Sequence, residues 1–123
     1  MFPPPIKQNL RIYQGATFKH VWTWLSGDAR NTAAPVDLTG CKARMQVRET
    51  HDMAEVLLDV STDDGRIRLG GAAGTIELYL HDEETEALRF DRGVYDLEIE
   101  FANGEKRRLF AGTVTLSPEV TRG

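Results

Sequence analysis

The sequence has a single cysteine, Cys41, among its 123 residues. One cysteine cannot form an internal disulfide or a multi-cysteine metal site, and its place on an alternating segment predicts an inward-facing, unreactive thiol. The three histidines, His20, His51 and His81, are isolated from one another, so no pair has a spacing that suits a metal. The sequence also has no Gly-x-Ser-x-Gly nucleophile elbow. We therefore expect no metal site, no cofactor and no enzymatic activity.

Long apolar runs and an excess of basic residues are also missing. No stretch approaches the ~20 residues that a membrane-spanning helix needs, and Met1–Pro5 lacks the basic and apolar regions of a secretory signal. The chain has 15 basic and 19 acidic residues, a formal net charge of −4, so no overall field favours nucleic acid or an anionic membrane. We expect a protein that is made in the cytoplasm and binds neither nucleic acid nor membranes.

Strand periodicity is present, most clearly in Gly93–Leu116. Apolar residues occupy every second position of Tyr95–Phe101 and acidic residues the positions between, which predicts a strand with one buried face and one acidic face. Asn103 and Gly104 follow at once, and this dipeptide is a strong signal for a two-residue type I′ turn. The segment is thus predicted to be a β-hairpin.

The predicted two-residue turn fixes the register of that hairpin. It places Glu100 opposite Arg107 on the outer face and Leu97 opposite Phe110 on the inner face. A slip of one residue would turn every side chain of the second strand to the other face, which favours this register. A β-bulge at Gly112 remains compatible with the pattern.

Further alternating segments predict more strands. Phe18–Leu25 has large apolar residues on both faces, which predicts a central strand or one covered on both sides. Cys41–Glu49 has a basic outer face, which predicts pairing with the acidic strand of the hairpin. The remaining strands are expected near Leu10–Ile12, Glu55–Ser61, Arg66–Leu69 and Thr75–Leu80.

One short helix is expected at Asp82–Leu88, where acidic residues at the start suit the helix dipole. About seven or eight strands at intervals of about ten residues, with one short helix, predict an all-β fold, an antiparallel β-sandwich that is Ig-like or similar. We expect an extended N-terminal arm over residues 1–7, a single sandwich domain over residues 8–116 and an extended tail over residues 117–123.

Several short stretches of turn and strand residues follow one another in a characteristic order: Gln14–Phe18, Thr23–Trp24, Val36–Gly40 with Ala43–Met45, Glu84–Leu88, Val94–Glu98, Asn103–Gly104, Gly112–Val114 and Pro118–Arg122. In this order they resemble a family of small structural proteins from the tail and baseplate of tailed phages and prophages. In that family the stretches form an opening glycine turn and strand, a short helix, and a closing hairpin and tail.

The resemblance implies a virion protein of the tail or baseplate, an assembly or adaptor subunit that acts through protein–protein contacts. A comparable role is that of the N-terminal β-sandwich of upper baseplate proteins, which docks a receptor-binding module onto the tail. The implied partners are other tail and baseplate proteins and further copies of the chain in a homo-oligomer. The contact residues are expected in the two ends of the chain: Phe2, Pro3, Pro4, Pro5, Pro118, Glu119, Val120 and Arg122.

A carbohydrate-binding module for receptor recognition is the alternative from a different class. Trp22, Trp24, Tyr13 or Tyr79 would then form a platform on which a sugar ring stacks. Core packing of the two tryptophans is the competing interpretation. Tryptophan fluorescence separates the two, because an exposed platform should respond to sugar and a buried pair should not.

Overall fold

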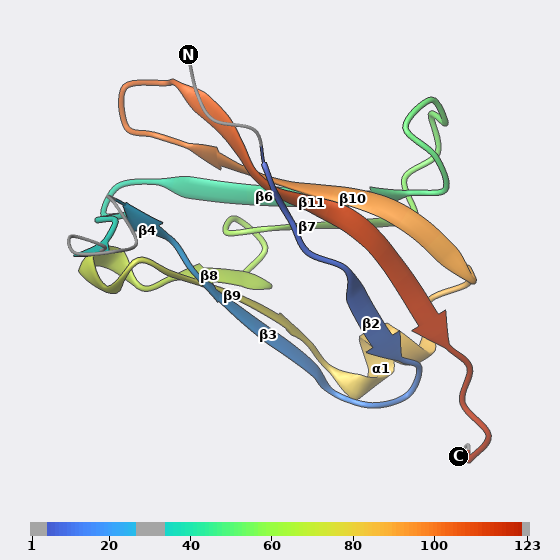
Figure 1. Cartoon of the computed structure of the whole chain (residues 1–123). Coiled ribbons are helices and arrows are strands. Elements are labelled where there is room, and N and C mark those ends of the chain that lie inside the picture. The colour runs from blue at the N-terminus through green and yellow to red at the C-terminus, as the bar shows by residue number, and fades with distance from the viewer. Residues whose placement is uncertain (1–4, 27–33, 122–123) are drawn as a thin grey trace.

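The computed structural model describes residues 5–26 and 34–121, which fold into two β-sheets packed face to face (Figure 1). The larger sheet has the order β1-β11-β10-β6-β7, with β2 also paired to β11, and the smaller has the order β3-β9-β8. The prediction of an all-β sandwich is confirmed. Two of its pairings are parallel, since β1 and β2 both run in the direction of β11.

The element bounds show which predicted strands form. The larger sheet contains β1 (Ile6–Lys7), β2 (Leu10–Tyr13), β6 (Lys42–Arg48), β7 (Leu58–Ser61), β10 (Arg92–Glu100) and β11 (Lys106–Ser117). The smaller sheet contains β3 (Phe18–Thr23), β8 (Ile67–Leu69) and β9 (Thr75–Leu80). The remaining elements are a short pair, β4 (Leu25–Ser26) with β5 (Ala34–Pro35), a 3-10 turn (Gly71–Ala73) and the helix α1 (Asp82–Glu86).

The core lies between the sheets and is built from alternate residues of each strand. In β6, β9 and β10 buried positions alternate with more exposed ones, as the period-two pattern predicts. The largest fully buried side chains are Ile12, Leu38, Met45, Val47, Val60, Ile67, Ile76, Leu78, Leu80, Leu97, Ile99 and Val114.

The hairpin closes with a three-residue loop, so the prediction of a type I′ turn is wrong. The Gly104 N–H donates to the Phe101 carbonyl (2.9 Å), and the Phe101 N–H donates to the Glu105 carbonyl (2.8 Å). Gly104 has φ +90°, and among the described residues only glycines have positive φ, so Asn103 stays outside the left-handed region. A type I turn followed by a glycine bulge is the usual form of this loop.

The longer loop changes the register near the turn. Glu100 faces Lys106, and Arg107 faces Ile99, so the predicted Glu100–Arg107 pair is wrong. Leu97 nevertheless faces Phe110, as predicted, because the register shifts by one residue between Leu97 and Glu98. The extra residue is Leu109, so the bulge lies there and not at Gly112.

β3 is an edge strand, so the prediction of a central or doubly covered strand is wrong. Only β9 pairs with it among the described residues. Val21, on the outer face, is 45% exposed, and Leu25 beyond the strand is 52% exposed. Large apolar residues on both faces therefore reflect exposed apolar side chains and not a second covering layer.

The predicted pairing of the basic and acidic strands is confirmed, since β6 lies beside β10 with Arg44 opposite Glu98 and Lys42 opposite Glu100. The helix is shorter than predicted. It ends at Glu86, and the Leu88 N–H donates to the Thr85 carbonyl (3.2 Å) in a tighter last turn.

Candidate interaction surfaces

The start of the described chain is fixed along the edge of the larger sheet. Ile6 faces Phe110 and Lys7 faces Ala111, and the chain then leaves the ladder at Gln8 before β2 resumes it. The Gln8 N–H donates to the Ala111 carbonyl (2.9 Å). These pairings hold the chain that leads out of the N-terminal arm against β11.

The detour at Gln8 is held by two features of the neighbouring strands. The Tyr95 hydroxyl donates to the Gln8 carbonyl (2.6 Å), and burial raises the pKa of Tyr95, which keeps this hydroxyl protonated as a donor. A Cβ atom at Gly112 would lie 2.3 Å from the same carbonyl oxygen, so the close approach requires glycine there.

The C-terminal tail is anchored by Gln14, in the turn after β2. The Gln14 N–H donates to the Ser117 carbonyl (2.9 Å), and the Gln14 side-chain oxygen accepts from the Glu119 N–H (3.2 Å). Val120 follows with 91% of its surface exposed. The tail is therefore held at its base and presents an apolar side chain to solvent.

The structure places the predicted contact residues at two separate locations. Pro5 is half-buried and precedes the Ile6–Phe110 pair near the middle of β11, whereas Pro118 follows the Ser117–Tyr13 pair at the C-terminal end of that strand. The seven residue-to-residue steps from Phe110 to Ser117 span roughly 23 Å of strand. Pro118 and Val120 are exposed and Glu119 is half-buried, while Phe2, Pro3, Pro4 and Arg122 lie outside the described residues.

A shallow depression beside the base of the tail was not found from the sequence. It has a volume of about 380 Å³, and Leu88, Phe90, Leu116 and Pro118 supply its apolar lining. These residues come from the α1–β10 connection and from the end of β11, which no local pattern brings together. Gln14, Arg89 and Asp91 complete the lining, so the depression at the tail end combines apolar and polar groups.

The outer face of the larger sheet is charged, but its charges are mutually paired. Arg44 contacts Asp59 at 3.1 Å and Arg108 contacts Asp96 at 3.3 Å. Exposed pairs of this kind contribute about 0–1 kcal/mol each to stability. Alternation of basic β6 with acidic β10 leaves no large field of one sign on this face.

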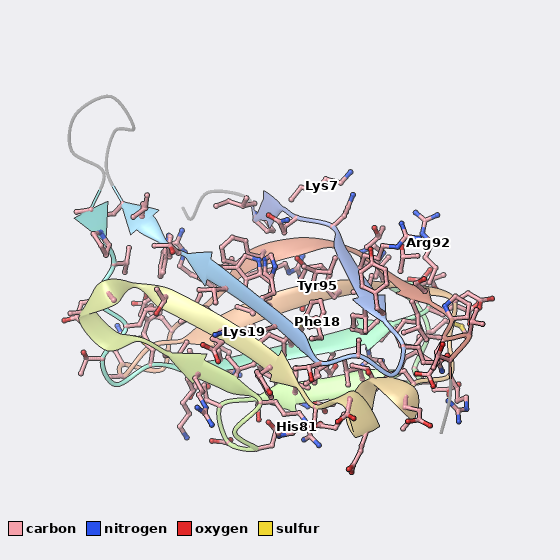
Figure 2. The ribbon with its side chains drawn as sticks, turned by 90° about the horizontal axis from the view of Figure 1, so that it is seen from below. Lys7, Phe18, Lys19, His81, Arg92 and Tyr95 are labelled. Atoms are coloured by element: carbon pink, nitrogen blue, oxygen red, sulfur yellow. The ribbon has the colours of Figure 1, made fainter. Side chains whose placement is uncertain are left out.

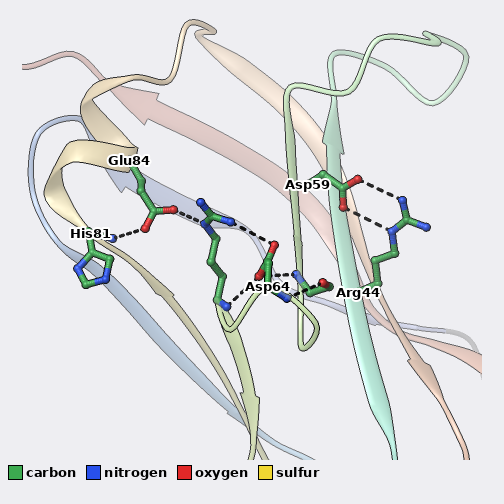
Figure 3. A network of polar contacts seen from close by, with 7 residues as sticks. Arg44, Asp59, Asp64, His81 and Glu84 are labelled. Atoms are coloured by element: carbon green, nitrogen blue, oxygen red, sulfur yellow. Dashed lines mark hydrogen bonds and ion pairs between the residues drawn. The ribbon is translucent and has the colours of Figure 1, made fainter.

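A network of polar contacts joins the turn after β7 to the helix (Figure 3). Arg66 contacts both Asp64 (3.2 Å) and Glu84, and Asp64 also accepts from the Ser61 and Arg66 N–H groups. Partial burial alone would raise the pKa of Glu84, but hydrogen bonds from Arg66 and from the His81 N–H outweigh it and hold that pKa below its usual value. Each of these charged groups has a partner within the network. We therefore assign the network the role of positioning the helix.

Groups suited to catalysis or metal binding do not converge in the described part of the chain. No three His, Cys, Asp or Glu side chains of residues 5–26 and 34–121 are placed to hold a metal ion. Cys41 is half-buried, and burial together with the charge of Asp37 raises the pKa of its thiol. A raised thiol pKa disfavours the reactive thiolate.

No helix in the described ranges is long and apolar enough to cross a membrane.

The aromatic residues proposed as a sugar platform are dispersed. Trp22 is 4% exposed and stacks on Phe110 across the core, with ring centroids 5.4 Å apart. Trp24 is half-buried against Phe101. Tyr13 is exposed at the edge of the larger sheet, whereas Tyr79 is half-buried on the smaller sheet. These four side chains do not form one platform.

His20 is expected to make folding sensitive to mildly acidic pH. It lies between Phe18 and Trp22 on β3, and burial lowers its pKa from 6.5. The unfolded chain therefore binds the proton more readily, so this contribution to stability is present above about pH 6.5 and is lost as the pH falls toward the lowered folded value. Urea unfolding should show that the free energy of unfolding decreases as the pH is lowered from about 7.5 to 5.5. His20→Gln should reduce this dependence of the free energy on pH.

Lys19→Gln is the matched control for this measurement, because Lys19 lies next to His20 but on the opposite face of β3. It should keep the slope of the unmodified protein. An unchanged slope in His20→Gln would assign the pH dependence to another group.

No protein-family model matches the chain, and no curated protein matches it. Among solved structures, it is similar to a chain from structure-based photo-crosslinking analyses of the multimeric cell-adhesive interactions of VGSC beta subunits. The two share 14% sequence identity over 94% of this chain and 93% of that chain, with a TM-score of 0.43. A likeness of this size says nothing about function.

Proposed function

We propose that the protein is a structural subunit of a phage or prophage tail or baseplate, located in the virion, that joins neighbouring proteins through its two chain ends. The observation that carries this role is the placement of those ends. The first described strand, β1, lies beside the middle of β11 at Phe110, whereas the tail continues from the C-terminal end of β11, and Gln8 and Gln14 anchor the two segments. Two separate attachment points suit an adaptor that contacts two different neighbours.

The composition of the surface supports the same role. The tail end combines exposed Val120 with the depression whose apolar lining includes Leu88 and Phe90. Interface cores are typically apolar and poor in charge, whereas the outer face of the larger sheet is covered with paired charges. We therefore assign the contacts with other tail proteins to the ends and not to that face.

Sedimentation of tailed particles tests this proposal. Particles from cells that carry the gene are separated on a density gradient, and the chain is detected by immunoblot and by gold-labelled antibody. The proposal predicts that the chain sediments with intact particles and that gold lies on the tail or baseplate. Recovery of the chain only in the soluble fraction would refute it.

Removal of residues 118–123 should prevent incorporation into particles while leaving the domain folded. The one hydrogen bond that an exposed or half-buried residue of 118–121 is seen to make to the rest of the described domain is Glu119 to Gln14, so loss of the tail should change the free energy of unfolding by about 1 kcal/mol. Incorporation is measured by the immunoblot above, and folding by circular dichroism. Met53→Ser, in an exposed loop elsewhere, is the control and should incorporate normally.

Carbohydrate recognition is the second candidate function, and Tyr79 is the residue that favours it. Tyr79 lines a depression of about 430 Å³ on the outer face of the smaller sheet, together with Lys19, Arg68 and Glu77. A tyrosine ring beside charged hydrogen-bonding groups suits a sugar. Binding on a glycan array that Tyr79→Ala abolishes would support this function, and an array without any signal would refute it.

A further inference from the structure

β3 is the longest open edge strand in the described part of the chain. It has six residues, compared with four in β7 and three in β8, which are the other strands at the ends of the two sheet orders apart from β1. Exposed edges of this length are templates for pairing with another chain, and proteins usually shorten or block them. The open edge of β3 therefore needs an explanation.

Hydrogen bonding in the smaller sheet shows which backbone groups of β3 are free. The Tyr79 N–H donates to the Arg66 carbonyl (2.9 Å), so the backbone of Tyr79 points toward β8. Its neighbours on β9 therefore point toward β3, where Leu78 faces His20. Because alternate residues of a strand point to opposite sides, the groups on the open side of β3 are the N–H and C=O of Lys19, Val21 and Thr23.

The side chains of β3 do not block this edge. Lys19, the one charged residue of the strand, has its Nζ atom 4.0 Å from Glu77 of the neighbouring strand β9, so it leans away from the open side (Figure 2). Val21, at the centre, is 45% exposed. The edge thus presents an apolar centre, and its one charge, on the exposed Lys19, is directed toward β9.

The inner face of β3 is incompletely covered on the same side. Phe18 and His20 are only half-buried, although they point toward the core. Trp22 is buried, yet its Nε1–H has no acceptor among the described residues. A buried donor without an acceptor destabilises the fold, so the packing on this side of β3 is incomplete.

We propose that β3 pairs edge to edge with β3 of a second copy of the chain, antiparallel about a two-fold axis at Val21. This deepens the proposed function, on which it rests, by assigning the contact between copies to one strand. Each facing pair on the open side exchanges two backbone hydrogen bonds, and the two small sheets become one continuous sheet.

The sequence of β3 is complementary to itself in this register. Val21 faces its own copy, and Lys19 faces Thr23, so no charge meets a like charge. On the inner face His20 lies beside Trp22 of the other copy, which adds aromatic cross-strand contacts and covers the half-buried rings. The N-terminal arm is a poor occupant of the edge, because Pro3, Pro4 and Pro5 have no N–H to donate.

Val21→Pro tests this pairing. The N–H of Val21 points outward, so proline removes a donor from the edge without breaking a bond to β9. Sedimentation equilibrium over a concentration series should show a dimer for the unmodified protein and for Val21→Thr, which keeps the N–H and the branched side chain. Association of Val21→Pro should be weaker by roughly tenfold or more.

A second variant and a local measurement test the pairing even if the proline variant fails to fold. Val21→Lys places two like charges at the two-fold axis, so its association should also weaken and should recover partly at high salt. Amide exchange at Val21 and Thr23 should slow as the unmodified protein is concentrated. A monomer at all concentrations, or dimerisation of Val21→Lys equal to that of the unmodified protein, would overturn the proposal.

Failure of this inference is distinguishable from failure of the proposed function. An unmodified protein that stays monomeric, or a dimer that forms equally in the edge variants, would leave particle incorporation and its dependence on residues 118–123 unaffected. Absence of the chain from particles would refute the proposed function whether or not β3 pairs.

Discussion

Leu97→Ala is expected to lower the free energy of unfolding by about 2–5 kcal/mol. Leu97 is fully buried in β10, between Met45 of β6 and Phe110 of β11. Truncation removes transfer energy and leaves a cavity that the central strands cannot close without losing their register. Urea unfolding followed by circular dichroism measures the change.

Val120→Ala is the control for this experiment, because that residue is 91% exposed and should change stability by less than about 0.5 kcal/mol. A loss below about 1 kcal/mol for Leu97→Ala would contradict the placement of Leu97 in the centre of the core.

Gly112→Val is expected to detach the N-terminal strands from the larger sheet and to lower the free energy of unfolding by about 1–3 kcal/mol. A Cβ at this position would lie 2.3 Å from the Gln8 carbonyl oxygen and 2.9 Å from the Asn9 side-chain oxygen. Because the first of these is backbone, the segment itself must move, and the Tyr95 hydroxyl then loses its acceptor. Amide exchange of residues 6–13 and proteolysis after Lys7 measure the detachment.

Thr113→Val is the matched control, since it places valine at the next position of β11, where a branched side chain of similar size is already present. Its backbone N–H, which donates to the Asn9 side chain (3.1 Å), is unchanged. Exchange in residues 6–13 should therefore resemble that of the unmodified protein. Equal protection of this segment in Gly112→Val would contradict the close approach of Gln8.

The strands that are half-buried were predictable from the sequence because burial of one face imposes the period-two pattern. β6, β9 and β10 follow the predicted segments closely for this reason. The hairpin loop was not predictable, because Asn103-Gly104 fits both a two-residue turn and a three-residue loop with a glycine bulge. The bulge at Leu109 sets the register, and it depends on packing against the rest of the sheet.

The position of β3 at an edge was also beyond the local pattern. Exposed Val21 gives the same sequence signal as a buried valine, and strand order depends on which segments pair across the chain. A glycine inside a strand was the one available signal for the N-terminal contact. The pattern at Gly112 is compatible with a bulge, whereas the glycine permits the close approach of Gln8.

The depression beside the tail could not be found from the sequence for a related reason. Phe90 lies outside the periodic segments, and Leu88 follows a helix that is one turn long. Only the return of β11 past the α1–β10 connection brings Leu116 to them. The two locations of the predicted contact residues likewise follow from the parallel pairing of β1 and β2 with β11.

Site-specific photo-crosslinking in assembled particles tests the central claim most directly. A photoreactive phenylalanine analogue replaces Ile6 near the arm, Val120 in the tail, or Met53 in the control loop, and the crosslinked products are identified by mass spectrometry. The account predicts that positions 6 and 120 crosslink to different tail or baseplate proteins and that position 53 does not crosslink. Particles in which neither position 6 nor position 120 reacts with a neighbour would contradict it.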